Sequence, residues 1–265
     1  MNPTIAAGRQ AGLATDSLSV WLEQGRARRP IVESISLRVA PGESIAIVGE
    51  SGSGKSVTAR ALLGLLPPEL TSEGDVKVAG TSFLRLSEAA RRRLRGNEIA
   101  FIMQDPFTML NPVMKVGDQV TAALRGADGR KLSRAERRAE AVARLNEVGI
   151  TDPAVVDKYP FQLSGGMRQR VGIAAAIAEN PRVLIADEPT TALDVTTQQE
   201  VLKLLDRLRR THELGLILIT HDLRVAFATC DRVYVMYAGQ IVEAGQTDAI
   251  RARPRHPYTA ALLAA

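Results

Sequence analysis

Residues 44–56 read Ser-Ile-Ala-Ile-Val-Gly-Glu-Ser-Gly-Ser-Gly-Lys-Ser, and this stretch decides the fold. The apolar run Ser44–Val48 predicts a short buried strand, and the glycine-rich segment after it leads into a predicted helix, Lys55–Leu65. Glycine lets the backbone curl with its N–H groups pointing inward, and the helix adds the positive end of its dipole. The stretch therefore predicts a P-loop, a backbone cradle for the phosphates of a nucleotide.

Each part of this loop has an expected role. Lys55 should reach the terminal phosphates of ATP, and the Ser56 hydroxyl should ligate Mg²⁺. The alternative is a glycine-rich turn before an ordinary helix, which the strand–loop–helix context disfavours. The residues expected to hold the nucleotide here are Gly49, Glu50, Ser51, Gly52, Ser53, Gly54, Lys55, Ser56 and Val57.

A second apolar run, Val183–Ala186, ends in two acidic residues, Asp187 and Glu188. A buried strand that delivers a carboxylate at its carboxyl end is how P-loop enzymes hold Mg²⁺, so Asp187 takes that role. Glu188, one residue further, can act on the attacking water as a general base or as a positioning group. The alternative is an acidic helix N-terminus.

Strand and helix patterns alternate through the second half of the chain, which predicts a parallel sheet covered on both faces. Between the two parts of this α/β core, a helix that begins at Ser133 with a Ser133–Glu136 capping box indicates a helical insertion. The expected organisation is a flexible tail over 1–16, a core over about 17–104 and 164–250, a helical subdomain over about 105–163, and C-terminal helices over about 246–265.

Composition narrows the class of protein. The chain has 265 residues, 45% of them hydrophobic, which suits a globular domain with a sizeable core. Cys230 is its only cysteine, so a disulfide framework and a cysteine-based metal site are excluded within it. A net charge of +5 suits phosphate-rich partners or an anionic membrane surface, although arginine-rich composition alone would also produce it. The apolar runs are too short to span a bilayer, so a soluble protein is expected.

A second helix start also offers free backbone N–H groups. Ser164 precedes Gly165 and Gly166 at the beginning of a strongly helical segment, an arrangement that combines an N-cap hydroxyl with the positive end of a helix. Two-fold pairing of chains would place the Ser164 turn of one subunit on the nucleotide held by the P-loop of the other. The alternative is an ordinary glycine-rich N-cap.

Together these motifs resemble those of the ATP-binding cassette (ABC) proteins. Gln104-Asp-Pro resembles the family's Q-loop, Ala192-Leu193-Asp194 its D-loop, and Thr220-His221-Asp222 its switch histidine. The resemblance implies that Gln104 touches Mg²⁺ and the attacking water, that Asp194 bridges two subunits, and that His221 binds the γ-phosphate and polarises the water. It also implies an α/β P-loop NTPase fold: a RecA-like parallel sheet, an N-terminal antiparallel β subdomain and an inserted α-helical subdomain.

Two positions depart from the family pattern. Met167 stands where most of the superfamily has glutamine, which should leave the phosphate contacts of the Ser164 turn intact. The family normally stacks an aromatic side chain near the first strand on adenine. Trp21 is the candidate for that role here, followed by Leu22.

Three segments resemble the importers of dipeptides, oligopeptides and nickel: the P-loop, Gln104–Pro112 and Arg255–Thr259. The resemblance implies ATP and Mg²⁺ as cofactors, a second identical or sister ATP-binding subunit, two membrane permease subunits and an external solute-binding protein. The chain would then lie peripherally on the cytoplasmic face of the inner membrane. Phe107–Gln119 would lie where the permease subunits dock, although a plain surface loop suits the same residues.

Longer relatives in this importer family carry an iron–sulfur cluster on a cysteine-bearing tail. Without those cysteines, no cluster is expected here, as in nickel-type members or half of a fused two-cassette chain.

Alternative functions account for fewer of these motifs. The basic composition also suits a soluble ABC ATPase acting on nucleic acid or ribosomes. The tandem cassettes, coiled-coil insertion or zinc cysteines of such proteins are missing, so no nucleic-acid partner is expected. A P-loop kinase leaves Ser164 and His221 without a role.

Overall fold

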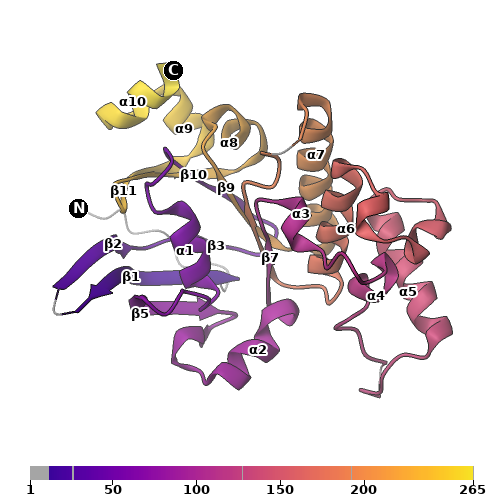
Figure 1. Cartoon of the computed structure of the whole chain (residues 1–265). Coiled ribbons are helices and arrows are strands. Elements are labelled where there is room, and N and C mark those ends of the chain that lie inside the picture. Colours follow the sequence, from indigo (N-terminus) through magenta and orange to yellow (C-terminus); the bar gives the residue numbers. More distant parts are fainter. Residues whose placement is uncertain (1–11, 26, 127, 192, 265) are drawn as a thin grey trace.

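The computed structural model describes residues 12–25, 27–126, 128–191 and 193–264 (Figure 1). Its centre is a six-stranded sheet in the order β11-β10-β4-β9-β8-β7. The strands from β10 to β7 run parallel to their neighbours, and β11 is antiparallel to β10. The strands are β4 (Ser44–Val48), β7 (Ile99–Ile102), β8 (Val183–Asp187), β9 (Gly215–Thr220), β10 (Arg232–Tyr237) and β11 (Gln240–Gln246). This order confirms the predicted parallel α/β core.

The sheet order brings the predicted motifs to one edge. In the parallel register β4 lies beside β9, and β9 lies beside β8. The P-loop follows β4, Asp187 ends β8, and His221 follows β9. Because the carboxyl ends of parallel strands share an edge, residues far apart in the chain converge on one site there.

Strand β4 is apolar from Ile45 to Val48 because it separates two cores. Ile45 and Ile47 face a cluster that includes residues of α1 and of the N-terminal sheet, whereas Ala46 and Val48 face a cluster built with α6 and α7. All four side chains are fully buried. Strands covered on both faces lose the alternation of polar and apolar residues, which explains the continuous apolar run.

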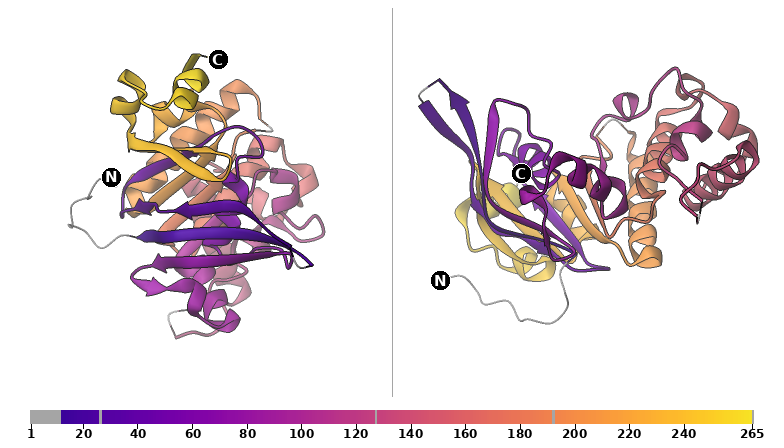
Figure 2. Two further views of the ribbon diagram at one scale, coloured as in Figure 1. Left: turned by 90° about the vertical axis from the view of Figure 1, so that its left-hand side faces the viewer. Right: turned by 90° about the horizontal axis from the view of Figure 1, so that it is seen from below.

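A second sheet is antiparallel, in the order β2-β1-β5-β6, with β3 also paired to β1. Figure 2 shows this sheet and the helical insertion at opposite ends of the molecule. The strands are β1 (Leu13–Gln24), β2 (Ala27–Ile35), β3 (Arg38–Val39), β5 (Leu70–Val78) and β6 (Thr81–Ser82). It is the antiparallel β subdomain that the family resemblance implied.

The predicted tail over 1–16 extends too far into the chain. Strand β1 begins at Leu13, which is fully buried and pairs with both Val39 and Val78. Thr15 is also buried, and its hydroxyl donates a hydrogen bond to the Ile35 carbonyl at 3.1 Å. Pairing partners more than twenty residues away create this strand start, and the local sequence carries no sign of it. Residues 1–11 lie outside the described part of the chain.

Helices flank the central sheet and build the insertion. The capping box at the start of α5 is confirmed: the Glu136 N–H donates to the Ser133 Oγ, and the Ser133 N–H donates to the Glu136 carboxylate. The helices are α1 (Lys55–Leu62), α2 (Glu88–Asn97), α3 (Pro106–Met109), α4 (Val116–Val120), α5 (Arg134–Glu147), α6 (Gly165–Ile177), α7 (Val195–His212), α8 (Leu223–Thr229), α9 (Thr247–Ala252) and α10 (Pro257–Ala264). Short 3₁₀ turns span Phe83–Arg85, Pro153–Asp157 and Pro160–Gln162.

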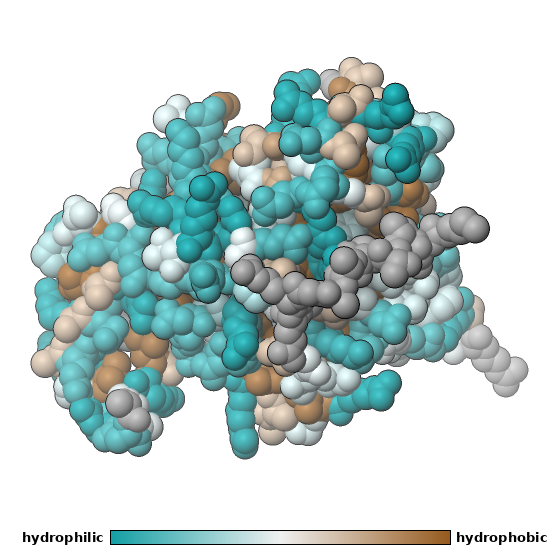
Figure 3. All heavy atoms as spheres, turned by 180° about the vertical axis from the view of Figure 1, so that it is seen from behind, coloured by the Kyte–Doolittle hydropathy of each residue, from teal (hydrophilic) through white to brown (hydrophobic). Residues whose placement is uncertain are grey.

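Hydrophilic side chains cover most of the face shown in Figure 3, with apolar ones in small groups. Throughout the described ranges, the helices are too short or too polar to cross a bilayer.

Candidate nucleotide-binding site

The P-loop encloses its own lysine. Lys55 Nζ donates hydrogen bonds to the carbonyl oxygens of Gly49 at 2.7 Å and Glu50 at 2.8 Å. Burial lowers the pKa of Lys55, while the nearby Glu188 and Asp187 carboxylates oppose that shift. The buried ammonium is thus held by two backbone carbonyl oxygens of the loop itself.

Two glycines of this loop are required by close packing. A Cβ on Gly49 would lie 2.1 Å from the Met236 carbonyl oxygen at the end of β10. Gly54 has φ +104°, and a Cβ there would lie 2.9 Å from the Met236 side chain and 3.3 Å from the Ile31 carbonyl. A side chain at either position would therefore push the loop off the sheet.

Two of the three predicted metal ligands, Ser56 and Asp187, lie side by side, whereas the third, Gln104, donates a hydrogen bond to Glu188. Ser56 Oγ donates a hydrogen bond to Asp187 Oδ1 at 3.2 Å. Burial raises the pKa of Asp187, and the neighbouring Glu188 adds to the shift, whereas the Ser56 hydrogen bond opposes it. A hydroxyl and one carboxylate fit Mg²⁺, which takes few protein oxygens when phosphates and water complete its octahedron. The described residues include no cluster of three or more His, Cys, Asp or Glu able to hold a metal.

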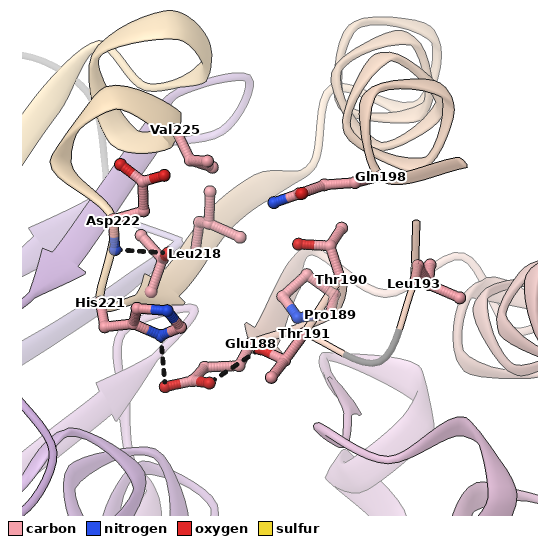
Figure 4. Close-up of a pocket in the computed structure, with 11 residues that line it drawn as sticks. Glu188, Pro189, Thr190, Thr191, Leu193, Gln198, Leu218, His221, Asp222 and Val225 are labelled. Atoms are coloured by element: carbon pink, nitrogen blue, oxygen red, sulfur yellow. Dashed lines mark hydrogen bonds and ion pairs between the residues drawn. The ribbon is translucent and has the colours of Figure 1, made fainter. Parts of the chain in front are cut away.

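Three side chains converge on the Glu188 carboxylate. The Thr191 hydroxyl donates to Oε2 at 2.8 Å, and His221 Nδ1 lies 3.3 Å from Oε1 (Figure 4). Gln104 Nε2 also donates to Oε2, at 3.1 Å. Glu188 adopts a left-handed backbone with φ +44°, which is strained for a residue with a side chain and is common at functional sites. The structure thus joins Gln104, Glu188 and His221, as predicted, and adds Thr191.

A pocket of 620 Å³ opens at the P-loop, a volume in the usual range for small-molecule sites. Its lining includes Val57, Gln104, Glu188 and His221 besides the loop itself. Ile31 of β2 also lines it, although the sequence offered no reason to select that residue. A smaller adjoining pocket of 220 Å³ lies on the other side of Glu188 and His221.

Trp21, the candidate adenine-stacking residue, has its own partners in the N-terminal sheet. It lies in β1, where the Arg28 guanidinium stacks 4.2 Å from the centre of its ring and Glu73 accepts its indole N–H at 3.1 Å. Trp21 is not among the described residues that line the P-loop pocket, and its role as the adenine-stacking residue stays a prediction. The strand pairing sets Trp21 opposite Pro30, and Ile31, the next residue of β2, is the one beside the loop.

The Ser164 turn caps α6. Ser164 Oγ accepts a hydrogen bond from the Met167 N–H at 3.3 Å. A Cβ on Gly166 would lie 2.7 Å from Thr197 Cγ2 in the first turn of α7, so a glycine is needed there. Among the described residues that line the P-loop pocket, none belongs to this turn. Ser164, Gly165 and Gly166 therefore stay apart from the P-loop of their own chain.

Asp194 caps the neighbouring helix. Its carboxylate accepts hydrogen bonds from the Thr197 N–H at 3.0 Å and the Thr197 hydroxyl at 2.7 Å. These hydrogen bonds, the backbone one first, lower the pKa of Asp194. Within one chain Asp194 thus has a structural role as the N-cap of α7. Ala192, the first residue of the predicted D-loop, lies outside the described residues.

Comparison with known proteins decides the family. The profile of the ABC transporter family matches residues 32–191, more than half of the chain. The chain belongs to the ABC transporter family. Two solved cassettes share its fold at 28% identity: a dimeric post-hydrolysis state of the ATP-binding cassette MJ0796 bound to ADP and Pi, and cbiO1 from Clostridium perfringens. The TM-scores are 0.76 and 0.77, covering 89% and 92% of this chain and 98% and 92% of those chains.

Curated ABC relatives are closer in sequence. The chain is 49% identical to the dipeptide transport ATP-binding protein DppD of Escherichia coli, over 96% of this chain and 77% of DppD. It is also 49% identical to the oligopeptide transport ATP-binding protein OppD of Bacillus subtilis, over 88% of this chain and 65% of OppD. The fold and the nucleotide pocket described above are those of an ABC ATPase.

Proposed function

We propose that this chain is the ATP-hydrolysing subunit of an importer for dipeptides or oligopeptides. The observation that carries the enzymatic part is the arrangement around Glu188, whose carboxylate is oriented by Gln104, Thr191 and His221 beside the P-loop. A carboxylate held by donors from three segments at the mouth of a phosphate cradle suits the orientation of one water molecule for in-line attack.

The nucleotide would enter by exchange of hydrogen-bond partners. The β- and γ-phosphate oxygens replace the Gly49 and Glu50 carbonyl oxygens as hydrogen-bond partners of Lys55. Because Lys55 is buried, its charge-assisted hydrogen bonds to the phosphates are strengthened. Ser56 and Asp187 would hold Mg²⁺, which neutralises charge on the phosphates when bound. Glu188 then accepts a hydrogen bond from the attacking water. His221, which lies beside the Glu188 carboxylate, would contact the γ-phosphate.

A second cassette would complete the site. The Ser164 turn offers free N–H groups and a hydroxyl but lies away from its own P-loop pocket. Pairing of two chains head to tail places that turn, with Asp194 beside it, on the nucleotide of the partner. The partner in this proposal is an identical or sister ATP-binding subunit, and the nucleotide joins the two.

Permease subunits would dock on the segment after Gln104. Phe107, Val113 and Met114 expose 59%, 80% and 38% of their surfaces, an unusual concentration of large apolar side chains within eight residues. The Arg168 guanidinium stacks 4.4 Å from the Phe107 ring centre, which links this surface to α6 and its Ser164 turn. Movement of the permease surface could reach the site through that contact.

Peptides, rather than nickel, are proposed as the cargo because DppD and OppD are named for dipeptide and oligopeptide transport. An external solute-binding protein would deliver the peptide, and the chain would lie on the cytoplasmic face of the membrane through its permease partners. A soluble ATPase acting on nucleic acid or ribosomes is not favoured, since neither these relatives nor the site geometry supports it.

Co-purification with the permease subunits, followed by ATPase assays in proteoliposomes, tests the proposal. Hydrolysis should rise when peptide-loaded solute-binding protein is added, and it should not respond to nickel-loaded binding protein. Stimulation by DNA or ribosomes, with no association with permease subunits, would overturn it.

A further inference from the structure

The C-terminal helix α10 reaches the P-loop through one hydroxyl. The Glu50 N–H donates a hydrogen bond to Tyr258 Oη at 3.0 Å, although the two residues are 208 positions apart in the chain. Figure 1 shows α10 beyond β11 and β10, at the end of the sheet order nearest β4. The contact therefore joins the last helix of the chain to the loop that should hold the phosphates.

This hydrogen bond falls on the peptide group that also holds Lys55. The Glu50 N–H and the Gly49 carbonyl belong to one planar peptide unit, and that carbonyl accepts Lys55 Nζ at 2.7 Å. In a trans peptide the N–H and C=O point in opposite directions. Tyr258 and Lys55 thus form hydrogen bonds to the Gly49–Glu50 peptide group from opposite sides, so a rotation of this group would break both hydrogen bonds.

Tyr258 is itself firmly placed. Its ring packs on Tyr237 at the end of β10, with the ring centres 4.5 Å apart. The Glu243 carboxylate in β11 accepts the backbone N–H groups of Arg255 and His256 at 2.9 and 3.1 Å. His256 Nδ1 accepts the Tyr258 N–H at 3.1 Å. Burial raises the pKa of Tyr258, so its hydroxyl stays neutral at pH 7 and brings no negative charge toward the phosphates.

The same part of the sheet supports the loop a second time. In the turn between β10 and β11, the Gly239 N–H donates a hydrogen bond to the Ser53 carbonyl at 3.0 Å. The Met236 carbonyl packs against Gly49. The P-loop is thus contacted by β10, by the turn between β10 and β11 and by α10, and Tyr258 is the side chain that contacts Glu50.

We propose that Tyr258 is a positioning residue that fixes the Gly49–Glu50 peptide group, and through it Lys55, in the orientation that nucleotide phosphates require. The inference rests on the proposed ATP binding and goes beyond it by giving the C-terminal element a role in nucleotide affinity. Tyr258 acts through the loop, without contact to the reacting atoms. Its loss should therefore weaken nucleotide binding more than it slows the chemical step.

Tyr258→Phe removes the hydroxyl and keeps the ring, and Tyr237→Phe is the matched control. Both tyrosines belong to one aromatic pair, but the hydrogen bonds of the described residues include none from the Tyr237 hydroxyl. The loss of one hydrogen bond should raise the Kd for a fluorescent ATP analogue, and the KM for ATP, about two- to tenfold. In Tyr258→Phe, kcat should stay within about twofold of wild type, as expected for a loss of uniform binding. Tyr237→Phe should have the wild-type Kd, KM and kcat.

Equal Kd values for Tyr258→Phe and Tyr237→Phe would overturn the inference, as would a fall in kcat with KM unchanged. Failure of the wild-type chain to bind the ATP analogue would instead overturn the proposed function. Hydrogen exchange at the Glu50 amide of the wild-type protein gives an answer that needs no variant. The inference requires exchange slower than that of an unprotected amide, and exchange at the unprotected rate contradicts it.

Discussion

His221 Nδ1 lies 3.3 Å from Glu188 Oε1, although the two residues directly follow different strands and are more than thirty positions apart in sequence. The pair forms because β8 and β9 are adjacent and parallel, so their carboxyl ends share an edge. A carboxylate with an imidazole beside it can align a water molecule and respond to the arrival of a γ-phosphate.

Replacement of Glu188, which should orient the attacking water, is expected to slow ATP hydrolysis and leave ATP binding intact. Glu188→Gln keeps the size of the side chain but cannot accept a proton, so kcat should fall by about 10²–10⁴-fold. The Kd for ATP should change little, and ATP should trap a closed dimer that light scattering detects. Glu69→Gln, an exposed position outside the site, is the control. Hydrolysis by Glu188→Gln at the wild-type rate would remove Glu188 from its assigned role.

Asp187→Asn should abolish activity and yet stabilise the nucleotide-free chain. Burial raises the pKa of Asp187, so the folded state binds its proton more tightly than the unfolded state does. The stability that comes from protonation is present at low pH and is lost as pH rises through the raised pKa. Without nucleotide, the thermal unfolding midpoint of Asp187→Asn should therefore be about 2–4 °C higher than that of the wild type at pH 8. The difference should be smaller at pH 4. A lower midpoint than wild type at pH 8 would contradict this.

Complementation between two inactive chains tests the shared nucleotide site. Lys55→Ala disables the P-loop, and Ser164→Arg fills the turn that should meet the partner's nucleotide. In a mixed pair, the intact P-loop of one chain meets the intact Ser164 turn of the other. Random pairing should restore about a quarter of wild-type ATPase activity, because half of the pairs are mixed and each has one complete site. Activity that stays at the level of the separate variants would argue against the two-chain site.

Gly166 should have a structural role that a second substitution can repair. Gly166→Ala places a methyl group 2.7 Å from Thr197 Cγ2, and such overpacking should cost about 1–3 kcal/mol of stability. Thr197→Ser removes that methyl and keeps the hydroxyl that bonds to Asp194. The double variant should regain most of the lost unfolding temperature.

ATPase activity of the same double variant distinguishes packing from function. If close approach of a partner's nucleotide also requires glycine at 166, hydrolysis should stay low although stability returns. Full recovery of both properties would restrict Gly166 to packing against α7.

The exposed apolar surface after Gln104 should matter only with the permease present. Val113→Asp puts a charge on a side chain that is 80% exposed, so the unfolding temperature and the basal ATPase rate should not change. Co-purification with the permease and peptide-stimulated hydrolysis should both be lost. Ala89→Asp, an exposed position on α2, is the control and should retain both. Normal coupling in Val113→Asp would place the permease elsewhere.

Features of short range could be predicted from the sequence. The P-loop is contiguous, and its glycines, Lys55 and Ser56 define a local backbone shape that the adjoining strand and helix already indicate. The apolar run before Asp187 and the Ser133–Glu136 capping box are local in the same sense. For these residues the conformation depends on neighbours within a few positions, so the pattern alone is informative.

Tertiary structure decided what depends on pairing between distant segments. The strand pairing places Trp21 against Arg28 and Ile31 beside the P-loop. It also makes Leu13 part of the antiparallel sheet, where a flexible tail was expected. The contact between Tyr258 and Glu50 exists only because α10 returns to the loop that follows β4. The motifs are encoded by residues next to one another in the chain. The partners that hold them in place are selected by packing, which no local pattern records.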